Sequence, residues 1–534
     1  MTQVAQQAEL IKLLTETNEF LRTQTISQQD QIQQLNQTIV NLQETIKQMN
    51  RKLFGASSEK ATPAQASGQL DMFNEAEVTA NPNAEEPTIE TVVSGYIRDP
   101  KKAKGKREDI LKNLPIIEIP CSVSEDLRSC DYCNTDMILL GNKFVREELR
   151  ITPAKVERIH YIQEVLICPT CKQDDVPVIV EAETPSPLMK HSLASPSTVA
   201  YVMYQKYANA LPLYRQEQDW KQMGVQLPRA TLANWVIHCG LDYMKPVYDL
   251  LHQYLLKRDI IHADEVPCQV LKEEGRAATS KSYMWVYASG NDGLPGIVLY
   301  DYHPGRKGDY AKTFLKGFSG FVHCDGYAGY NKLEDVIRIG CYAHLRRKFF
   351  EAMPAEKNKL IVKTPAEIGY DYCNRLFELE RKFKDMTAAE RKEARLEQEA
   401  PVLKAFWKWV DSLNPTNGSG LAKAITYAKN QRKSLENYLL DGRCEISNNK
   451  AERKVKSYVI GRKNFLFHDS VKGAQSSSII YSLVETAKAN NLNIYQYLYM
   501  ILLYMPDYKN EPEGIEKLMP WSDMIQQSCA VKKN

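Results

Sequence analysis

The segments that decide the fold are Ile260-Ile261-His262-Ala263-Asp264-Glu265 and Phe321-Val322-His323-Cys324-Asp325-Gly326. Each is an apolar run typical of a strand, and each ends in an acidic residue followed by a loop. Three further elements are expected in this region: strands at Ser282 to Ala288 and Gly296 to Tyr302, and a helix at Asp309 to Lys316.

Asp264 and Asp325 are the first candidate functional residues. If their strands are neighbours and end together, the two carboxylates lie within a few ångströms of each other. Two such charges repel unless a divalent cation lies between them, and oxygen ligands suit Mg²⁺ or Mn²⁺. Order and residue type therefore predict a metal site here.

The composition bounds the protein class. A chain of 534 residues predicts three or four domains, and 43% hydrophobic with 25% charged residues is typical of a soluble globular protein. The net charge is only +3, so a nucleic-acid partner must be recognised by local clusters of basic residues. No targeting segment is visible, and the apolar run Tyr497 to Met505 is too short to span a bilayer. We expect a cytoplasmic protein that does not bind membranes.

Residues 1–55 carry a heptad pattern. Ile11, Ile32, Ile39 and Ile46 fall at position a, and Leu14, Leu21, Leu35 and Leu42 fall at position d. This pattern favours a parallel, self-associating coiled coil over a single amphipathic helix. Residues 56–95 have the composition of a flexible linker.

Residues 96–185 are expected to form a zinc-ribbon-like DNA-binding domain. The pairs Cys130–Cys133 and Cys168–Cys171 are two knuckles with 34 residues between them. Two knuckles complete a tetrahedral site, so a structural Zn²⁺ is favoured over a redox-active pair. A basic run from Lys101 to Arg107 is equally compatible with a phosphate contact and with a solvated segment.

Residues 186–250 are expected to be helical. Two helices flank the turn Met223 to Pro228, which resembles a helix-turn-helix and could place Arg229, Thr231 and Asn234 against DNA. An ordinary helical hairpin fits the same pattern. Further along, Asn449 and Glu452 fit a helix N-terminal capping box, and local sequence alone favours that role for Glu452.

Several motifs together resemble those of the bacterial insertion sequence 66 transposases. The resemblance runs nearly end to end, and its motifs are the Asp264 segment, His323 to Tyr330, Cys341 to Phe349, Asn448 to Arg453, Ile460 to Phe467 and Ser482 to Lys488. It implies a multidomain α/β chain with a ribonuclease-H-like core and a DDE triad of Asp264, Asp325 and Glu452. The resemblance thus overrides the capping role of Glu452.

The resemblance also implies a domain layout and a mechanism. The core would comprise residues 251–353 and 441–505, interrupted by a helical insertion at 354–440 and followed by a C-terminal tail at 506–534. Two Mg²⁺ or Mn²⁺ ions would be held by the triad, with Asp264 bridging them. Water would first free a 3′-OH at the element's end, and that 3′-OH would then attack target DNA.

The implied partners are the DNA ends of the element, target DNA and further copies of the chain, with accessory proteins of the same element as candidates. We expect the protein at the nucleoid. Basic residues beside the triad are candidate phosphate contacts: Arg346, Arg347, Lys348, Arg453, Lys454, Lys456, Arg462 and Lys463. Tyr327, Tyr330 and Phe465 could stack on DNA ends, and core packing explains them equally well. Arg395, in the expected helical insertion, could also face DNA, but a solvated helical surface is the role favoured for most basic residues there.

Two other functions fit parts of the sequence. A nuclease without strand transfer would keep the same core. A non-catalytic DNA-binding regulator would need only the coiled coil, the zinc site and the helix-turn-helix. The presence of all three acidic residues favours an enzyme over the regulator.

Overall fold

The computed structural model of the protein describes residues 11–29, some positions from 31 to 38, and residues 116–152, 155–171, 178–353, 363–509 and 511–531. The expected linker and the basic run at Lys101 to Arg107 lie outside these residues. The chain divides into two compact units. The first is Met1–Lys60, Phe321–Tyr327 and Ile337–Asn449, and the second is Ala61–Gly320, Ala328–Val336 and Lys450–Asn534.

The described part of the N-terminal heptad region is helical over residues 11–29. Its apolar a and d side chains lie open to solvent, because Ile11, Leu14 and Leu21 are 64%, 57% and 52% exposed. A helix that exposes its apolar stripe gains stability by burying that stripe against a partner.

Residues 116–183, here called the zinc module, contain a four-stranded sheet. Its strands are β1 (Ile116–Cys121), β2 (Ile138–Thr152), β3 (Lys155–Ile167) and β4 (Ile179–Glu181). The order is β1-β3-β2, with β4 also paired to β3. β2 runs antiparallel to β3 and β1 parallel to it. A short 3-10 helix, η1 (Glu125–Leu127), precedes the first cysteine pair.

A helical segment follows the zinc module. Its elements are α5 (Pro196–Met203), η3 (Tyr204–Ala208), α6 (Leu213–Gln222), α7 (Arg229–Cys239), η4 (Gly240–Met244) and α8 (Lys245–Leu256). The expected pair of helices around the turn is confirmed by α6 and α7. Gly224 in that turn has φ 85°, a conformation that glycine adopts without strain, and Val225 and Leu227 are buried.

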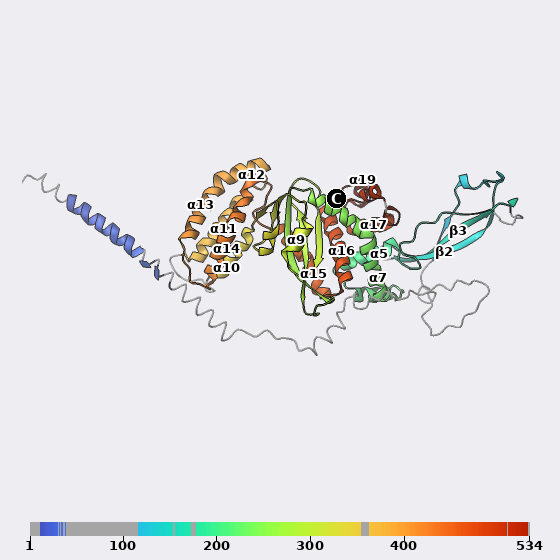
Figure 1. The fold of residues 1–534 in the computed structure, drawn as a ribbon, viewed down its shortest axis with the longest axis horizontal. Coiled ribbons are helices and arrows are strands. Elements are labelled where there is room, and N and C mark those ends of the chain that lie inside the picture. Colours follow the sequence, from blue (N-terminus) through green and yellow to red (C-terminus); the bar gives the residue numbers. More distant parts are fainter. Residues whose placement is uncertain are drawn as a thin grey trace, which may run out of the picture. The chain divides into compact units, whose positions relative to one another are not determined.

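The second sheet of the chain has six strands (Figure 1). Its strands are β5 (Ile260–Lys272), β6 (Lys281–Ser289), β7 (Val298–His303), β8 (Gly320–His323), β9 (Val336–Ile339) and β10 (His468–Ser470). The order is β7-β6-β5-β8-β9, and β10 pairs in parallel with β5. β5, β6 and β7 form an antiparallel meander. Between β7 and β9 lie α9 (Gly308–Phe314) and the 3-10 turn η5 (Ala328–Lys332).

The expectation that the first strand ends at Asp264 is wrong, because β5 continues to Lys272. Its pairing with β6 extends from Ile261 to Gln269, so the backbone hydrogen bonds continue past the two acidic residues. Acidic residues normally disfavour strands, but here Glu265 is buried with ion-pair and hydrogen-bond partners that offset this cost.

The long helix α16 (Val471–Ala489) covers the edge of the sheet that β7 forms. Its Ser482 hydroxyl accepts a hydrogen bond from the Tyr300 N–H (2.7 Å), and Thr486 Oγ1 bonds to the Val298 backbone at both its N–H (3.0 Å) and its carbonyl (2.9 Å). These side chains satisfy edge groups that would otherwise be open to pairing with another strand.

The C-terminal region of the second unit is helical. Its helices are α15 (Asn449–Phe465), α16 (Val471–Ala489), α17 (Ile494–Tyr508), α18 (Pro512–Glu516) and α19 (Asp523–Cys529). The stretch 506–534 is therefore more than a tail, since Leu518, Met519 and Ile525 in it are fully buried. Among the described residues, no helix combines the length and apolar character needed to cross a bilayer.

The first unit contains the segment expected to be a helical insertion, and its described part is helical. The elements are α10 (Tyr342–Ala352), α11 (Pro365–Lys382), α12 (Ala388–Ala394), η6 (Arg395–Glu399), α13 (Ala400–Ser412), α14 (Gly420–Glu436) and η7 (Asn437–Leu440). Thr364 and Thr387 begin α11 and α12 with capping boxes. Buried Phe349, Leu379 and Phe406 form part of its core.

Candidate functional site

Asp264 lies on β5, opposite Val286 of β6. Its side chain is half-buried, and its Oδ1 accepts a hydrogen bond from the Glu265 N–H (2.9 Å). Regular pairing continues on both sides of Asp264, so the carboxylate is carried by a strand and not by a loop. A strand holds a functional group in a more precise position than a loop does.

The neighbouring Glu265 has a structural role. Successive residues of a strand point to opposite faces, and Glu265 is only 8% exposed. Its Oε1 accepts a hydrogen bond from Arg306 Nε (2.6 Å), and its Oε2 accepts one from the Tyr330 hydroxyl (2.5 Å). Tyr330 is therefore a buried core residue that cannot stack on DNA, as is Phe465 (2% exposed).

Asp325 lies in the turn that follows β8. Its Oδ1 accepts a hydrogen bond from the Tyr327 N–H (2.9 Å), and the preceding Cys324 N–H donates to the Ile339 carbonyl (3.1 Å). A side chain that accepts the N–H two residues on forms an Asx turn, which fixes the carboxylate relative to its backbone.

Tyr427 of α14 packs on this turn, a contact that sequence reasoning missed. A Cβ added to Gly326 would lie 2.5 Å from Tyr427 Cε2, so only glycine fits beside the ring. Burial raises the pKa of the Tyr427 hydroxyl well above its usual value, and the nearby charge of Asp325 adds to the shift. The insertion thus contacts the Asp325 turn directly.

The insertion begins and ends at one point of the first unit. The Tyr342 N–H donates to the Ile446 carbonyl (3.1 Å), and the Asn448 N–H donates to Cys341 Sγ (3.2 Å). The start of helix α10 therefore lies beside the segment with which the chain leaves the insertion. That segment precedes Glu452 by only a few residues.

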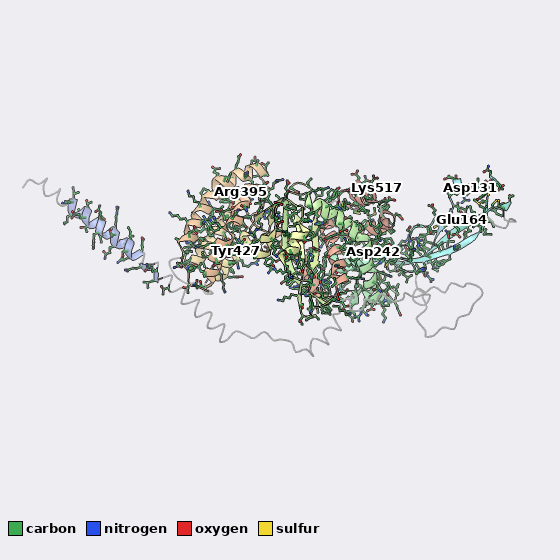
Figure 2. The ribbon with its side chains drawn as sticks, viewed as in Figure 1. Asp131, Glu164, Asp242, Arg395, Tyr427 and Lys517 are labelled. Atoms are coloured by element: carbon green, nitrogen blue, oxygen red, sulfur yellow. The ribbon has the colours of Figure 1, made fainter. Side chains whose placement is uncertain are left out.

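Arg395 fastens that returning segment. It is fully buried, contrary to the expectation of a solvated residue; Figure 2 labels its position among the helices of the first unit. Its guanidinium donates to both carboxylate oxygens of Glu380 (2.6 and 2.9 Å). It also donates to the carbonyls of Tyr438 (3.1 Å), Asp441 (3.2 Å) and Cys444 (2.8 Å). No simple pattern in the sequence separates this arginine from exposed ones on the same helices.

Glu452 lies in the first turn of α15 and is half-buried. Asp264 and Glu452 belong to the second unit, whereas Asp325 belongs to the first. The convergence of the three carboxylates therefore stays a prediction.

Lys450 of α15 donates a hydrogen bond to Asn291 Oδ1 (3.0 Å), and the other basic residues of this helix fall into two groups. Arg453, Lys456 and Lys463 are exposed, recur at helical spacing, and form no ion pair within the described residues. Lys454 instead forms an ion pair with the buried Glu485 (2.9 Å), and the Arg462 guanidinium donates to the Pro267 carbonyl. Only the first group presents unpaired charge to a ligand.

The other candidate phosphate contacts are similarly divided. Arg347 is exposed on α10, whereas Arg346 stacks over Phe377 (4.6 Å) and Lys348 lies over the Tyr427 ring (5.0 Å). At the start of α7, Arg229 is half-buried beside the Tyr214 ring (5.7 Å). Thr231 is only 5% exposed, so its side chain packs inside the helical segment.

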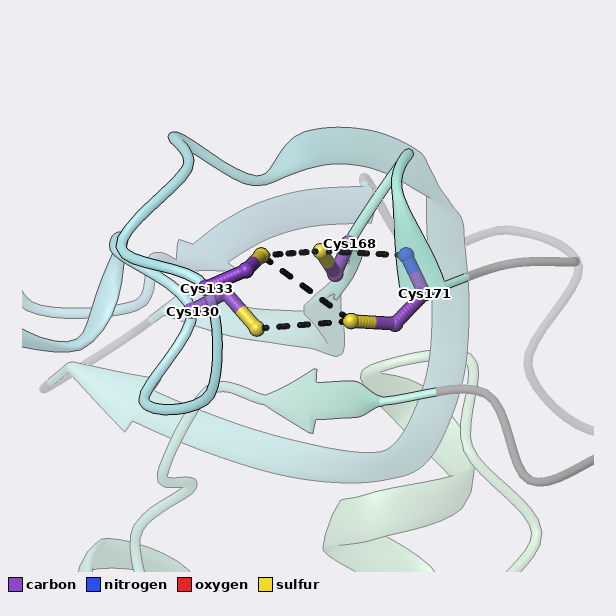
Figure 3. Close-up of side chains that lie close together, drawn as sticks. All are labelled: Cys130, Cys133, Cys168 and Cys171. Carbon is purple, nitrogen blue, oxygen red and sulfur yellow. Dashed lines mark hydrogen bonds between the residues drawn. The ribbon is translucent and has the colours of Figure 1, made fainter. Parts of the chain in front are cut away.

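The four predicted zinc ligands come together (Figure 3). Their sulfur atoms all lie within 4.8 Å of one another, including Cys133–Cys168 at 3.5 Å and Cys130–Cys171 at 3.9 Å. A tetrahedral zinc with sulfur ligands at about 2.3 Å requires sulfur–sulfur separations of about 3.8 Å, so the cluster fits this ion. Cys121 lies apart from the cluster and is not a ligand.

The electrostatics of the cysteine cluster also call for a cation. Hydrogen bonding to Thr135 lowers the pKa of Cys133 to about 6. Hydrogen bonding to Cys168 and burial raise the pKa of Cys171 to about 12. Four thiols this close resist full ionisation unless a metal ion compensates their charge.

The amino-acid sequence matches known families along most of its length. Residues 191–476 match the family described as Transposase IS66 family. Residues 41–119 match Transposase C of IS166 homeodomain, residues 128–172 match the zinc-finger binding domain of transposase IS66, and residues 482–521 match the IS66 C-terminal element.

Two proteins of Sinorhizobium fredii are similar over nearly the whole chain. The uncharacterized protein y4qI is 30% identical over 514 residues, covering 91% of this chain and 89% of that protein. The uncharacterized protein y4jD is 27% identical over 509 residues, covering 92% and 96%. With the family match over more than half of the chain, these similarities show that the protein belongs to the IS66 family of transposases.

Proposed function

We propose that this transposase cleaves the DNA ends of an insertion sequence and joins them to target DNA, using Asp264, Asp325 and Glu452 as a DDE triad. The observation that carries the proposal is the strand order β7-β6-β5-β8-β9. In this order the strand bearing Asp264 neighbours the strand that leads into Asp325. Glu452 lies in the first turn of the helix that follows the insertion. This arrangement supports a ribonuclease-H-like core.

The triad would hold two divalent cations, Mg²⁺ or Mn²⁺, which would activate the attacking oxygen and stabilise the leaving 3′-oxygen. Asp264 would contact both ions, and Asp325 and Glu452 one each. The backbone hydrogen bonds to Asp264 and Asp325 would keep their carboxylates oriented toward that site. Hydrolysis would free a 3′-OH at the element's end. In strand transfer that 3′-OH would attack a target phosphate, so one phosphodiester bond forms as another breaks.

The exposed cations of α15 would bind DNA phosphates near the triad. Arg453, Lys456 and Lys463 lie on one face of α15, the helix whose first turn contains Glu452. Arg347 and Arg229 are further candidate contacts, in the first and second units respectively. Neutralising phosphates releases counterions, so we expect binding to weaken as salt rises. A DNA substrate would place the protein in the cytoplasm at the nucleoid.

The zinc module would hold one structural Zn²⁺ through Cys130, Cys133, Cys168 and Cys171. The N-terminal heptad helix would join two copies of the chain. Its exposed a and d side chains support this assembly, which would bring two element ends together.

The central test is cleavage of a labelled duplex carrying the element's own end in the presence of Mg²⁺. Asp264→Asn should abolish cleavage and leave binding of the duplex intact, because the substitution removes a ligand charge without removing a side chain. Asp309→Asn is the matched control, since Asp309 is an exposed residue that pairs with Lys332 (2.8 Å). Retained cleavage by Asp264→Asn would refute the triad.

Strand transfer needs a separate assay, because a nuclease with the same core would also cleave. Supplying pre-cleaved ends with a target plasmid bypasses the first step. Joined products that disappear in Asp325→Asn support a transposase. Cleavage without joining under the same conditions would favour the nuclease.

A further inference from the structure

The zinc module carries an excess of acidic residues. Residues 116–183 contain thirteen acidic and seven basic residues, a net charge of −6 in a chain whose total is +3. A tetrahedral site of four thiolates around Zn²⁺ adds two further negative charges. The field of this module therefore repels a phosphate backbone.

The described basic residues of the module all form ion pairs within it. Each described lysine or arginine of the module forms an ion pair with one of its glutamates: Arg128–Glu164, Lys143–Glu181, Arg146–Glu148, Arg150–Glu157, Lys155–Glu157 and Arg158–Glu147. Binding a phosphate would require breaking these pairs. The described part of the module thus offers none of the unpaired cations that nonspecific DNA affinity depends on.

The acidic residues, in contrast, are in excess. Six exposed carboxylates form no ion pair within the described residues: Glu118, Glu125, Asp126, Asp131, Asp136 and Glu183. Four of them flank the first cysteine pair, and Figure 2 labels Asp131 on this part of the module.

Large apolar side chains lie exposed in the same region. Tyr132 is 84% exposed, and Ile138, Leu139 and Leu140 at the start of β2 are 53%, 55% and 48% exposed. Leu139 and Phe144 (39%) lie opposite Leu166 and Ile162 of β3, so these two exposed side chains share one face of the sheet. Ile138 and Ile179 (47%) both lie beside Ile167, on the other face. Exposed apolar side chains on one face of a module that also exposes carboxylates are characteristic of protein interaction sites.

We propose that this acidic and apolar face of the zinc module docks a basic protein surface that carries its own apolar side chains. Charge complementarity selects that partner. A second copy of the same face would bring two negative surfaces together, and duplex DNA would present a still higher density of negative charge. The module would thereby recruit a protein to the transposase while other elements hold DNA.

Binding of a fluorescent synthetic peptide of alternating lysine and leucine to the full-length, zinc-loaded protein tests the proposal. Leu139→Ser with Phe144→Ser removes apolar surface, and Asp126→Asn with Asp131→Asn removes charge. All four side chains are exposed, so the module should still fold and keep its zinc. We expect each double variant to weaken peptide binding by about tenfold or more.

The matched control is Leu294→Ser with Glu513→Gln, an exposed apolar and an exposed acidic position outside the module. It should bind the peptide as the unmodified chain does. Zinc content and affinity for a nonspecific duplex should be unchanged in all variants. Peptide affinity unaffected by the module variants would overturn the proposal. A selective loss of duplex affinity would identify the face as a DNA surface, and a selective loss of self-association in sedimentation would identify it as an interface between copies; either result also refutes it.

Discussion

The zinc module and helix α15 both carry a series of basic residues, but the two regions use them differently. In the zinc module each described cation is paired with a glutamate, whereas Arg453, Lys456 and Lys463 of α15 are exposed and form no ion pair within the described residues. The density of lysine and arginine in a sequence therefore does not locate a DNA-binding surface. What matters is whether a carboxylate already neutralises each of them.

Removing zinc should have the largest effect of all the changes. It should unfold the zinc module and leave duplex binding by α15 intact. Cys168→Ser removes a buried ligand, and structural zinc contributes roughly 10–16 kcal/mol of apparent binding free energy to small metal-dependent folds. We expect loss of bound zinc and rapid proteolysis within the module, measured by metal analysis and limited digestion. Duplex binding by α15 should persist.

Cys121→Ser is the matched control for that experiment. Cys121 is a half-buried cysteine of the same module that lies outside the cluster. Zinc lost from Cys121→Ser as readily as from Cys168→Ser would contradict the four-cysteine assignment.

The next effect concerns affinity for DNA. Lys456→Gln with Lys463→Gln should weaken binding of a nonspecific duplex by about tenfold or more and lower the slope of log affinity against log salt by about two. Lys143→Gln with Arg150→Gln makes the same change of charge in the zinc module and should leave both quantities unaltered. Equal losses of duplex affinity in the two double variants would show that paired and unpaired cations contribute equally to DNA binding.

Within α15, Lys454 and Lys456 should differ in their contribution to thermal stability, and this difference is the smallest effect expected. Burial alone would raise the pKa of Glu485, but the ammonium groups of Lys454 and Lys488 outweigh burial and lower it. A lowered carboxyl pKa stabilises the fold above the pKa of the unfolded chain, and this stability is lost as the pH falls through the folded-state pKa. Lys454→Gln should therefore lower thermal stability near neutral pH, by about 1–3 kcal/mol, and progressively less in acid.

Thermal unfolding followed at several pH values checks this expectation, with Lys456→Gln as the control that should leave the melting temperature nearly unchanged. A loss that stays constant from neutral to acidic pH would show that Lys454 contributes packing and not charge.

The sequence located most elements of the core because its signals are local. The strands β6, β7 and β8, the helices α6 and α7, and the two cysteine pairs each depend on short-range patterns. The sequence predicts that β5 ends at Asp264, because acidic residues are unfavourable in strands. Glu265 is accommodated in the strand by its partners Arg306 and Tyr330. Those partners lie more than forty positions away in the chain.

The burial of individual side chains could not be predicted from the sequence. Thr231, Tyr330, Phe465 and Arg395 were candidates for contact with DNA or solvent, yet all four side chains are buried. Tyr427 was overlooked for the same reason, since its role depends on the missing Cβ of Gly326 a hundred residues earlier. Such contacts join segments that no periodicity links.

The closure between Tyr342 and Ile446 has a consequence for chain entropy. A flexible excursion of about a hundred residues would cost roughly 4 kcal/mol to close, by the logarithmic dependence on loop length. Because the excursion is a folded bundle whose two ends meet, and because Arg395 fastens the returning end, the chain from Asp325 to Glu452 behaves as a short tether. Replacing the bundle by a brief linker between these two ends should thus be topologically permitted. Arg395 adds to the order of the returning end through the carbonyls of Tyr438, Asp441 and Cys444.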